Sequence, residues 1–87
     1  MYQVRILEEA KRELAHLDKS VAHRITQRIL WLTENLHYIK PEPLKGELSG
    51  LFKLRVGAYR VIYEILSIEQ LIIIHAIGHR SEIYKRR

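Results

Sequence analysis

Cysteine is absent from the 87-residue sequence, which excludes a disulfide framework, a thiolate nucleophile and a zinc site with cysteine ligands. Long apolar runs are absent too. The longest, residues 71–77, is interrupted by His75 and is far too short to span a membrane. The N-terminus has no basic segment followed by an apolar one, so we expect no signal peptide. The sequence therefore predicts a cytoplasmic protein that makes no contact with a membrane.

The length of the chain allows one small domain, which we place at residues 1–87. A hydrophobic fraction of 47% beside 29% charged residues is typical of a globular chain rather than a disordered one. The formal net charge of +5 is distributed unevenly, because residues 1–43 carry +1 and residues 44–87 carry +4. A basic half of this kind predicts a polyanion or an acidic protein as partner, although a solubilising surface has the same composition.

The first half of the sequence has the pattern of a strand followed by two helices. Residues 2–6 alternate apolar and polar side chains, which predicts a short strand. From Glu8 apolar residues recur at helical spacing, and a second amphipathic stripe follows between residues 21 and 36. Only residues 18–20 connect the two helices, so we expect an antiparallel hairpin. A Pro-Glu-Pro segment then ends the helical half, because proline cannot continue a helix.

The second half alternates with a period of two, which predicts strands over residues 53–56, 59–66 and 71–77. Gly57 suits the first position of a two-residue hairpin turn. The last strand is apolar on both faces, so we expect it inside the sheet, and Ser81 can cap a short C-terminal helix. The predicted fold class is α+β with the order β-α-α-β-β-β. In it, the N-terminal strand and the helix hairpin pack on one face of a mostly antiparallel sheet.

Strand alternation places four cations on the sheet face that the helices leave open: Lys53, Arg55, Arg60 and Arg80. Neighbouring cations are costly unless an anion lies among them, and the planar fork of arginine suits a phosphate. The alternatives are a solvated basic face or ion pairs with Glu47 and Glu64. We interpret the face as a phosphate-binding surface.

The segment from Gly78 to Tyr84 places an imidazole, a guanidinium and a phenol near the end of the last strand. Histidine moves protons near neutral pH, and tyrosine transfers a proton or stacks on a base. A regular strand would turn His79 toward the helices beside His75, so we interpret His79 as structural. These two histidines are too far apart to share a metal ion, and no metal site is predicted.

The segments Leu48–Ile65 and Gly78–Tyr84 resemble the RelE/ParE superfamily of bacterial and archaeal toxins, and most of all its RelE branch. The most specific parts are Leu-Arg-Val-Gly-x-Tyr-Arg-Val-Ile-Tyr and Gly-His-Arg-x-x-Ile-Tyr. The resemblance covers nearly the whole chain. It implies a RelE-like fold and a toxin of a type II toxin–antitoxin system that cleaves messenger RNA in the ribosomal A site.

The resemblance assigns catalysis, position by position, to four residues: Lys53, Arg60, Arg80 and Tyr84. We expect further RNA contacts from three more: Arg55, Lys85 and Arg86. This chain has Leu51 and His79 where RelE proteins carry lysines, and its tyrosine follows two residues earlier. Two residues, His79 and Glu64, are therefore the candidates for the group that transfers the proton.

RNA supplies its own nucleophile, the 2′-hydroxyl, so the reaction needs neither metal nor cofactor. The protein must hold the phosphate in line, stabilise its developing charge and move two protons. The partners implied are the ribosome, messenger RNA and an acidic, partly disordered RelB-like antitoxin, with operator DNA contacted only through that antitoxin. The alternatives are a ParE-like inhibitor of DNA gyrase, a degenerate toxin and a non-catalytic module that binds RNA or protein.

Overall fold

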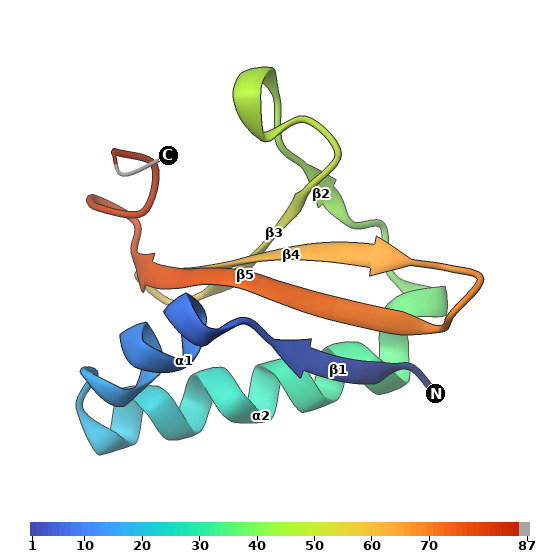
Figure 1. Cartoon of the computed structure of the whole chain (residues 1–87). Coiled ribbons are helices and arrows are strands. Elements are labelled where there is room, and N and C mark those ends of the chain that lie inside the picture. Colours follow the sequence, from blue (N-terminus) through green and yellow to red (C-terminus); the bar gives the residue numbers. More distant parts are fainter. Residues whose placement is uncertain (86–87) are drawn as a thin grey trace.

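The computed structural model describes residues 1–85, in which two helices cover one face of a five-stranded sheet (Figure 1). Its elements are β1 (Gln3–Ile6), α1 (Glu8–Ala15), α2 (Lys19–Asn35), the 3₁₀ turn η1 (Leu36–Tyr38), β2 (Glu42–Pro43), the 3₁₀ turn η2 (Gly46–Leu48), β3 (Phe52–Val56), β4 (Tyr59–Leu66) and β5 (Leu71–His79). The strand order is β1-β5-β4-β3-β2. β1 runs parallel to β5, and the other neighbours are antiparallel.

The predicted α+β class is confirmed, with one strand that the sequence did not indicate. That strand, β2, has only two residues, and Glu42 lies opposite Lys53 in its pairing with β3. Pro43 fits there because an edge strand needs no donor on its outer side. The predicted strand at residues 71–77 is confirmed inside the sheet and continues to His79.

The predicted C-terminal helix is wrong, because residues 80–85 form turns. The N–H groups of Glu82 and Ile83 both donate to the carbonyl of His79, at 2.9 Å each. The carbonyl of His79 therefore accepts two hydrogen bonds, and no continuous series of helical hydrogen bonds follows within the described residues. The remainder of the predicted helix, residues 86–87, lies outside the described residues.

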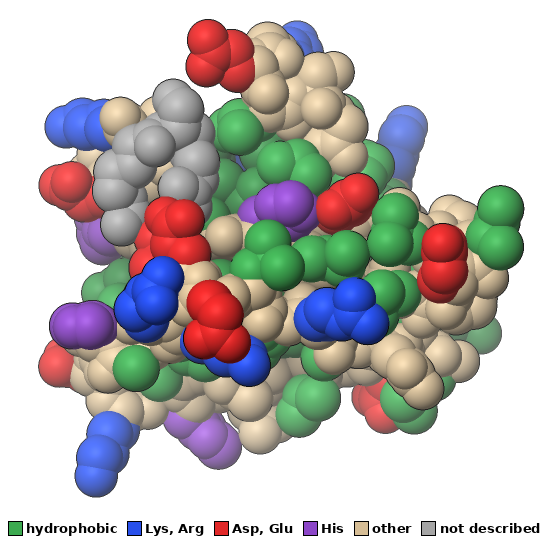
Figure 2. Space-filling model, viewed as in Figure 1, with side chains coloured by type: hydrophobic (Ala, Val, Ile, Leu, Met, Phe, Trp, Pro, Cys, Tyr) green, Lys and Arg blue, Asp and Glu red, His purple; other side chains and the backbone are tan. Residues whose placement is uncertain are grey.

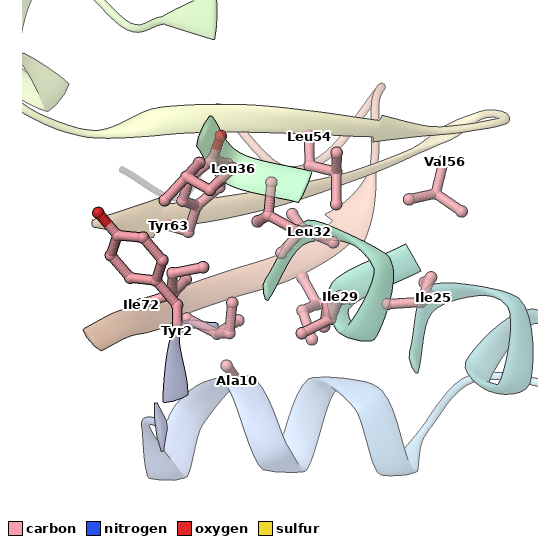
Figure 3. Packing of buried hydrophobic residues seen from close by; sticks show 13 residues of the cluster. Tyr2, Ala10, Ile25, Ile29, Leu32, Leu36, Leu54, Val56, Tyr63 and Ile72 are labelled. Atoms are coloured by element: carbon pink, nitrogen blue, oxygen red, sulfur yellow. The ribbon is translucent and has the colours of Figure 1, made fainter. Parts of the chain in front are cut away.

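The main hydrophobic core lies between α2 and the sheet (Figure 3). Ile25, Ile29 and Leu32 are buried on α2 at helical spacing and face Leu54 and Val56 of β3. This matches the stripe that the sequence predicts between residues 21 and 36. Burial of apolar area of this kind is the main stabilising contribution to a small domain.

The prediction that the helices leave the opposite sheet face open is wrong in part, because a second small core covers some of that face. Ile62, Ala76 and Ile83 are fully buried there, with three leucines packed against them: Leu44, Leu48 and Leu51. Figure 1 shows that the C-terminal turn and the loop before β3 rise on this side of the sheet, away from the helices. The C-terminal turn is thus tethered to the sheet by one buried side chain.

A β-bulge in β5 reverses the predicted orientation of His75. Ile62 pairs with Ala76 and Tyr63 pairs with Ile74, so His75 is an extra residue with no partner in the ladder. Its Nε2 lies 2.9 Å from Oε1 of Glu64, on the face away from the helices. The placement of His75 under the helices is therefore wrong, because strict alternation does not hold across the bulge.

Candidate functional site

A carboxylate that no sequence motif indicated lies among the predicted cations. Arg55 Nε donates to Glu42 Oε1 at 2.9 Å, and its Nη2 donates to Oε2 at 3.1 Å. Lys53 Nζ lies 3.8 Å from the same carboxylate. This bidentate pair forms because β2 places Glu42 directly opposite Lys53, two residues from Arg55. The expected ion pairs of these cations with Glu47 and Glu64 do not form within residues 1–85, and Glu64 pairs with His75 instead.

The ion pair between Glu42 and Arg55 lowers the pKa of the carboxylate and raises the pKa of the guanidinium. The hydrogen bond from Arg55 lowers the pKa of Glu42, partial burial opposes this shift, and the charges of Arg55, Lys53 and Arg60 add to it. The hydrogen bond to Glu42 in turn raises the pKa of Arg55. The carboxylate is therefore ionised throughout the physiological pH range.

Tyr84 completes this group, which we call the Glu42 cluster: Glu42, Lys53, Arg55 and Tyr84. Lys53 Nζ lies 6.0 Å from the centre of the Tyr84 ring, at the limit of a cation–π contact. The phenol is 39% exposed, whereas Ile83 beside it is fully buried. Ile83 therefore anchors the turn that presents Tyr84. The Ile-Tyr pair of the motif Gly-His-Arg-x-x-Ile-Tyr is the sequence signal for this anchor.

Arg60 lies beside the Glu42 cluster but is not a free surface cation, which corrects its predicted place on an open face. It is only 8% exposed, and its Nη1 donates to the carbonyls of Gly57 and Tyr59, at 2.9 and 2.8 Å. It lies directly opposite Arg55 in the β3–β4 ladder. Two like charges at such a pair repel each other, and the Glu42 carboxylate and the two carbonyls offset that repulsion. Its Nε and Nη2 form no protein hydrogen bond in the part of the chain that the structure describes.

Arg80 and Lys85 are the exposed cations of the C-terminal turn. The backbone N–H of Arg80 donates to the carbonyl of Ala58 at 2.8 Å, which places Arg80 beside the β3–β4 hairpin turn. Neither side chain forms an ion pair within residues 1–85. Arg86 lies outside the described residues.

The two proton-transfer candidates, His79 and Glu64, lie elsewhere. His79 Nδ1 accepts the backbone N–H of Ser81 at 3.1 Å, and its ring packs edge-on against Tyr59 with centroids 5.4 Å apart. Glu64 is engaged by His75. Within residues 1–85, neither candidate forms a hydrogen bond or an ion pair with the Glu42 cluster. The carboxylate in contact with the cations is Glu42.

Two other features of the described residues bear on function. They contain no group of three or more histidine, aspartate or glutamate side chains arranged to hold a metal ion. None of their helices is both long and apolar enough to cross a bilayer.

Comparison with known proteins gives consistent matches. A family model described as the ParE toxin of the type II toxin–antitoxin system, parDE, matches residues 4–84. Toxin RelG of Mycobacterium tuberculosis is 29% identical over 85 residues, which cover 98% of each chain. Toxin RelE of the same organism is 31% identical over 84 residues, which cover 97% of this chain and 87% of that toxin.

A solved structure supports the same assignment. The toxin–antitoxin complex RelBE2 of Mycobacterium tuberculosis superposes with a TM-score of 0.81 and 29% identity, over 91% of this chain and 98% of that one. The resemblance seen in the sequence motifs is therefore confirmed. Because the matched family model spans nearly the whole sequence, the chain belongs to the RelE/ParE family, the toxins of type II toxin–antitoxin systems.

Proposed function

We propose that this toxin is a ribosome-dependent endoribonuclease that cleaves messenger RNA in the A site, with the RNA 2′-hydroxyl as nucleophile. The observation that carries the proposal is the Glu42 cluster, in which a carboxylate, two cations and a half-exposed phenol meet at one edge of the sheet. These groups are the ones that metal-independent cleavage of RNA requires. A ribosomal partner would place the protein in the cytoplasm.

Each group has a role that its surroundings support. Lys53, Arg60 and Arg80 stabilise the negative charge that develops on the phosphate, and Arg60 is already held in place by two carbonyls. Tyr84 is exposed enough to stack on a base and to give a proton to the leaving 5′-oxygen. Preorganised cations of this kind need no rearrangement during the reaction.

Glu42 is the group that we assign to proton removal, in place of His79 or Glu64. It is ionised at neutral pH, because its pKa is lowered, and it contacts Arg55 and Lys53, of which Lys53 is one of the cations that would hold the phosphate. A carboxylate of low pKa is a weak base, so it acts best on a hydroxyl that these cations have already polarised. Removal of its charge should therefore slow cleavage without disrupting the sheet.

The regulatory partner that we propose is an acidic, partly disordered antitoxin of the RelB type. The solved relative from Mycobacterium tuberculosis is a toxin–antitoxin complex. The net charge of +5 on the toxin is complementary to an acidic segment that folds as it binds. Operator DNA would be contacted through the antitoxin.

Arg80→Ala tests the nuclease, because Arg80 is exposed and has no ion pair within residues 1–85. Primer extension on messenger RNA from translating ribosomes should show codon-positioned cuts with the wild type. The cuts should fall by about 10²–10³-fold with the variant, as when one transition-state contact is removed. Arg5→Ala is the matched control, since Arg5 is exposed on β1, at the opposite edge of the sheet. Full cutting by a folded Arg80→Ala protein would refute the role.

Gyrase inhibition is the second candidate function, because the matching family model is described as a ParE toxin. A supercoiling assay with purified gyrase separates the two activities. Inhibition of supercoiling in the absence of messenger RNA cuts would establish the gyrase activity and overturn the nuclease proposal.

A further inference from the structure

A groove runs between α2 and the β2–β3 edge of the sheet, next to the Glu42 cluster. Two cavities form it, of about 220 and 430 Å³, and they adjoin because Arg28 and Arg55 line both. We call it the α2 groove. Its lining includes five cations, one carboxylate and two aromatic rings: Arg24, Arg28, Lys40, Lys53, Arg55, Glu42, Trp31 and Tyr63.

The α2 groove contains most of the net charge of the chain. Five cations and one carboxylate line it, for a net charge of +4, against +5 for the whole sequence. The face that carries α1 and β1 is mixed: Figure 2 shows blue and red side chains interspersed there. A groove in which positive charge is concentrated attracts polyanions and raises their local concentration.

The cations on the helix side have no counter-ion in the described part of the chain. Within residues 1–85, Arg24, Arg28 and Lys40 form no ion pair, and Glu42 is occupied by Lys53 and Arg55. Arg24 and Arg28 are one helical turn apart and therefore face the same way. Arg24 reaches over the β3–β4 turn, where its guanidinium would be 3.9 Å from a Cβ placed on Gly57.

Arg28 has a second feature that suits a nucleic acid. Its guanidinium lies 4.1 Å from the centre of the Trp31 ring, which holds it as a flat, charged platform. Bases stack on guanidinium planes and aromatic rings, while arginine forks bind phosphate oxygens in pairs. The groove thus offers both kinds of contact that single-stranded RNA makes.

We propose that the α2 groove binds single-stranded RNA, namely the stretch of messenger RNA that continues from the scissile phosphate. The identity of this strand rests on the proposed nuclease function. Arg55 belongs both to the Glu42 cluster and to the groove, so a strand held at the cluster enters the groove as it passes Arg55. Acidic peptides also carry negative charge, but the Arg28–Trp31 platform and the continuity with the cluster favour RNA.

The experiment measures binding rather than cleavage. A fluorescent oligouridylate of roughly 12 nucleotides, within the usual 4–16-nucleotide site size, is titrated with the whole toxin at salt concentrations from about 50 to 200 mM. Each phosphate contact on a single strand contributes about 0.7 to the slope of log K against log salt. The double variant R24Q/R28Q should therefore lower that slope by about 1.4. Across this salt range the wild type should then lose about 7-fold more affinity than the variant.

The matched control is K11Q/R12Q, which removes the same charge from the exposed face of α1, outside the α2 groove. Thermal unfolding shows that each variant is folded. An unchanged slope in R24Q/R28Q, or an equal fall of the slope in the control, would contradict RNA binding in the α2 groove. The proposal would also be overturned if R24Q/R28Q lost binding to a polyglutamate peptide while its RNA binding stayed unchanged, because the groove would then be a site for an acidic protein. RNA bound through the groove by a toxin that makes no cuts would refute the nuclease and leave the groove standing.

Discussion

Ile83 is the side chain on which the placement of Tyr84 depends, and Ile83→Ala tests that dependence. Ile83 is fully buried against Ile62 and Ala76, while the residues on either side of it are exposed. The substitution removes three carbon atoms. At about 0.8 kcal/mol for each buried carbon, with an added cost for the cavity, it should destabilise the turn by about 2–4 kcal/mol.

We expect this cost to appear as local opening of the turn rather than as global unfolding. The turn lies near the chain end, and its second small core is separate from the main core under α2. A loss of about 2.8 kcal/mol raises the open population about 100-fold, which should be seen in the hydrogen exchange of the Ile83 and Lys85 amides. Messenger RNA cuts should fall as well, because an open turn removes both Arg80 and Tyr84 from the site.

Two controls separate local from general destabilisation. Ile83→Val leaves two of the three carbon atoms and should cost only about 0.5–1.5 kcal/mol. Ile25→Ala weakens the main core and should lower the melting temperature while raising the exchange of amides throughout the chain. If the amide at position 83 of the Ile83→Ala protein exchanges within about 3-fold of the wild-type rate, the anchoring role is refuted.

Three further predictions concern ionisable groups. Glu42→Gln should reduce messenger RNA cuts by about 100-fold, whereas Glu64→Gln should leave them unchanged; the reverse pattern would move the base to Glu64. Because the pKa of Glu42 is lowered, its ion pairs stabilise the fold at neutral pH, and this contribution is lost as the pH falls through that pKa. The melting temperatures of wild type and Glu42→Gln, different at pH 7, should therefore converge as the pH falls below the pKa of Glu42. Burial raises the pKa of Tyr63 to about 12 from its ordinary 10.0, so stability should be lost at about 1.4 kcal/mol per pH unit between those values. Urea unfolding along an alkaline series should show this loss in the wild type and not in Tyr63→Phe.

The elements that the sequence predicted correctly are those with a local pattern. The helical stripe of α2 repeats over many residues, and β4 is a long run rich in apolar and β-branched side chains, so each can be recognised without its neighbours. β2 has two residues and no period, and it exists only because β3 offers a partner. The bulge at His75 likewise depends on the register between β4 and β5. Pairing between distant segments therefore accounts for what periodicity could not predict.

The candidate site shows the same division. The motifs indicated the cations, because arginine and lysine are recognisable one residue at a time. The motifs did not indicate Glu42, which meets Arg55 across 13 residues of sequence through the β2–β3 register. Without that carboxylate, only the two carbonyls that accept from Arg60 would offset the repulsion between the directly opposed Arg55 and Arg60. Glu42 thus supplies the negative charge among these cations that a bound phosphate would otherwise have to supply. The cations can therefore be assembled before any anion binds, with a carboxylate already among them.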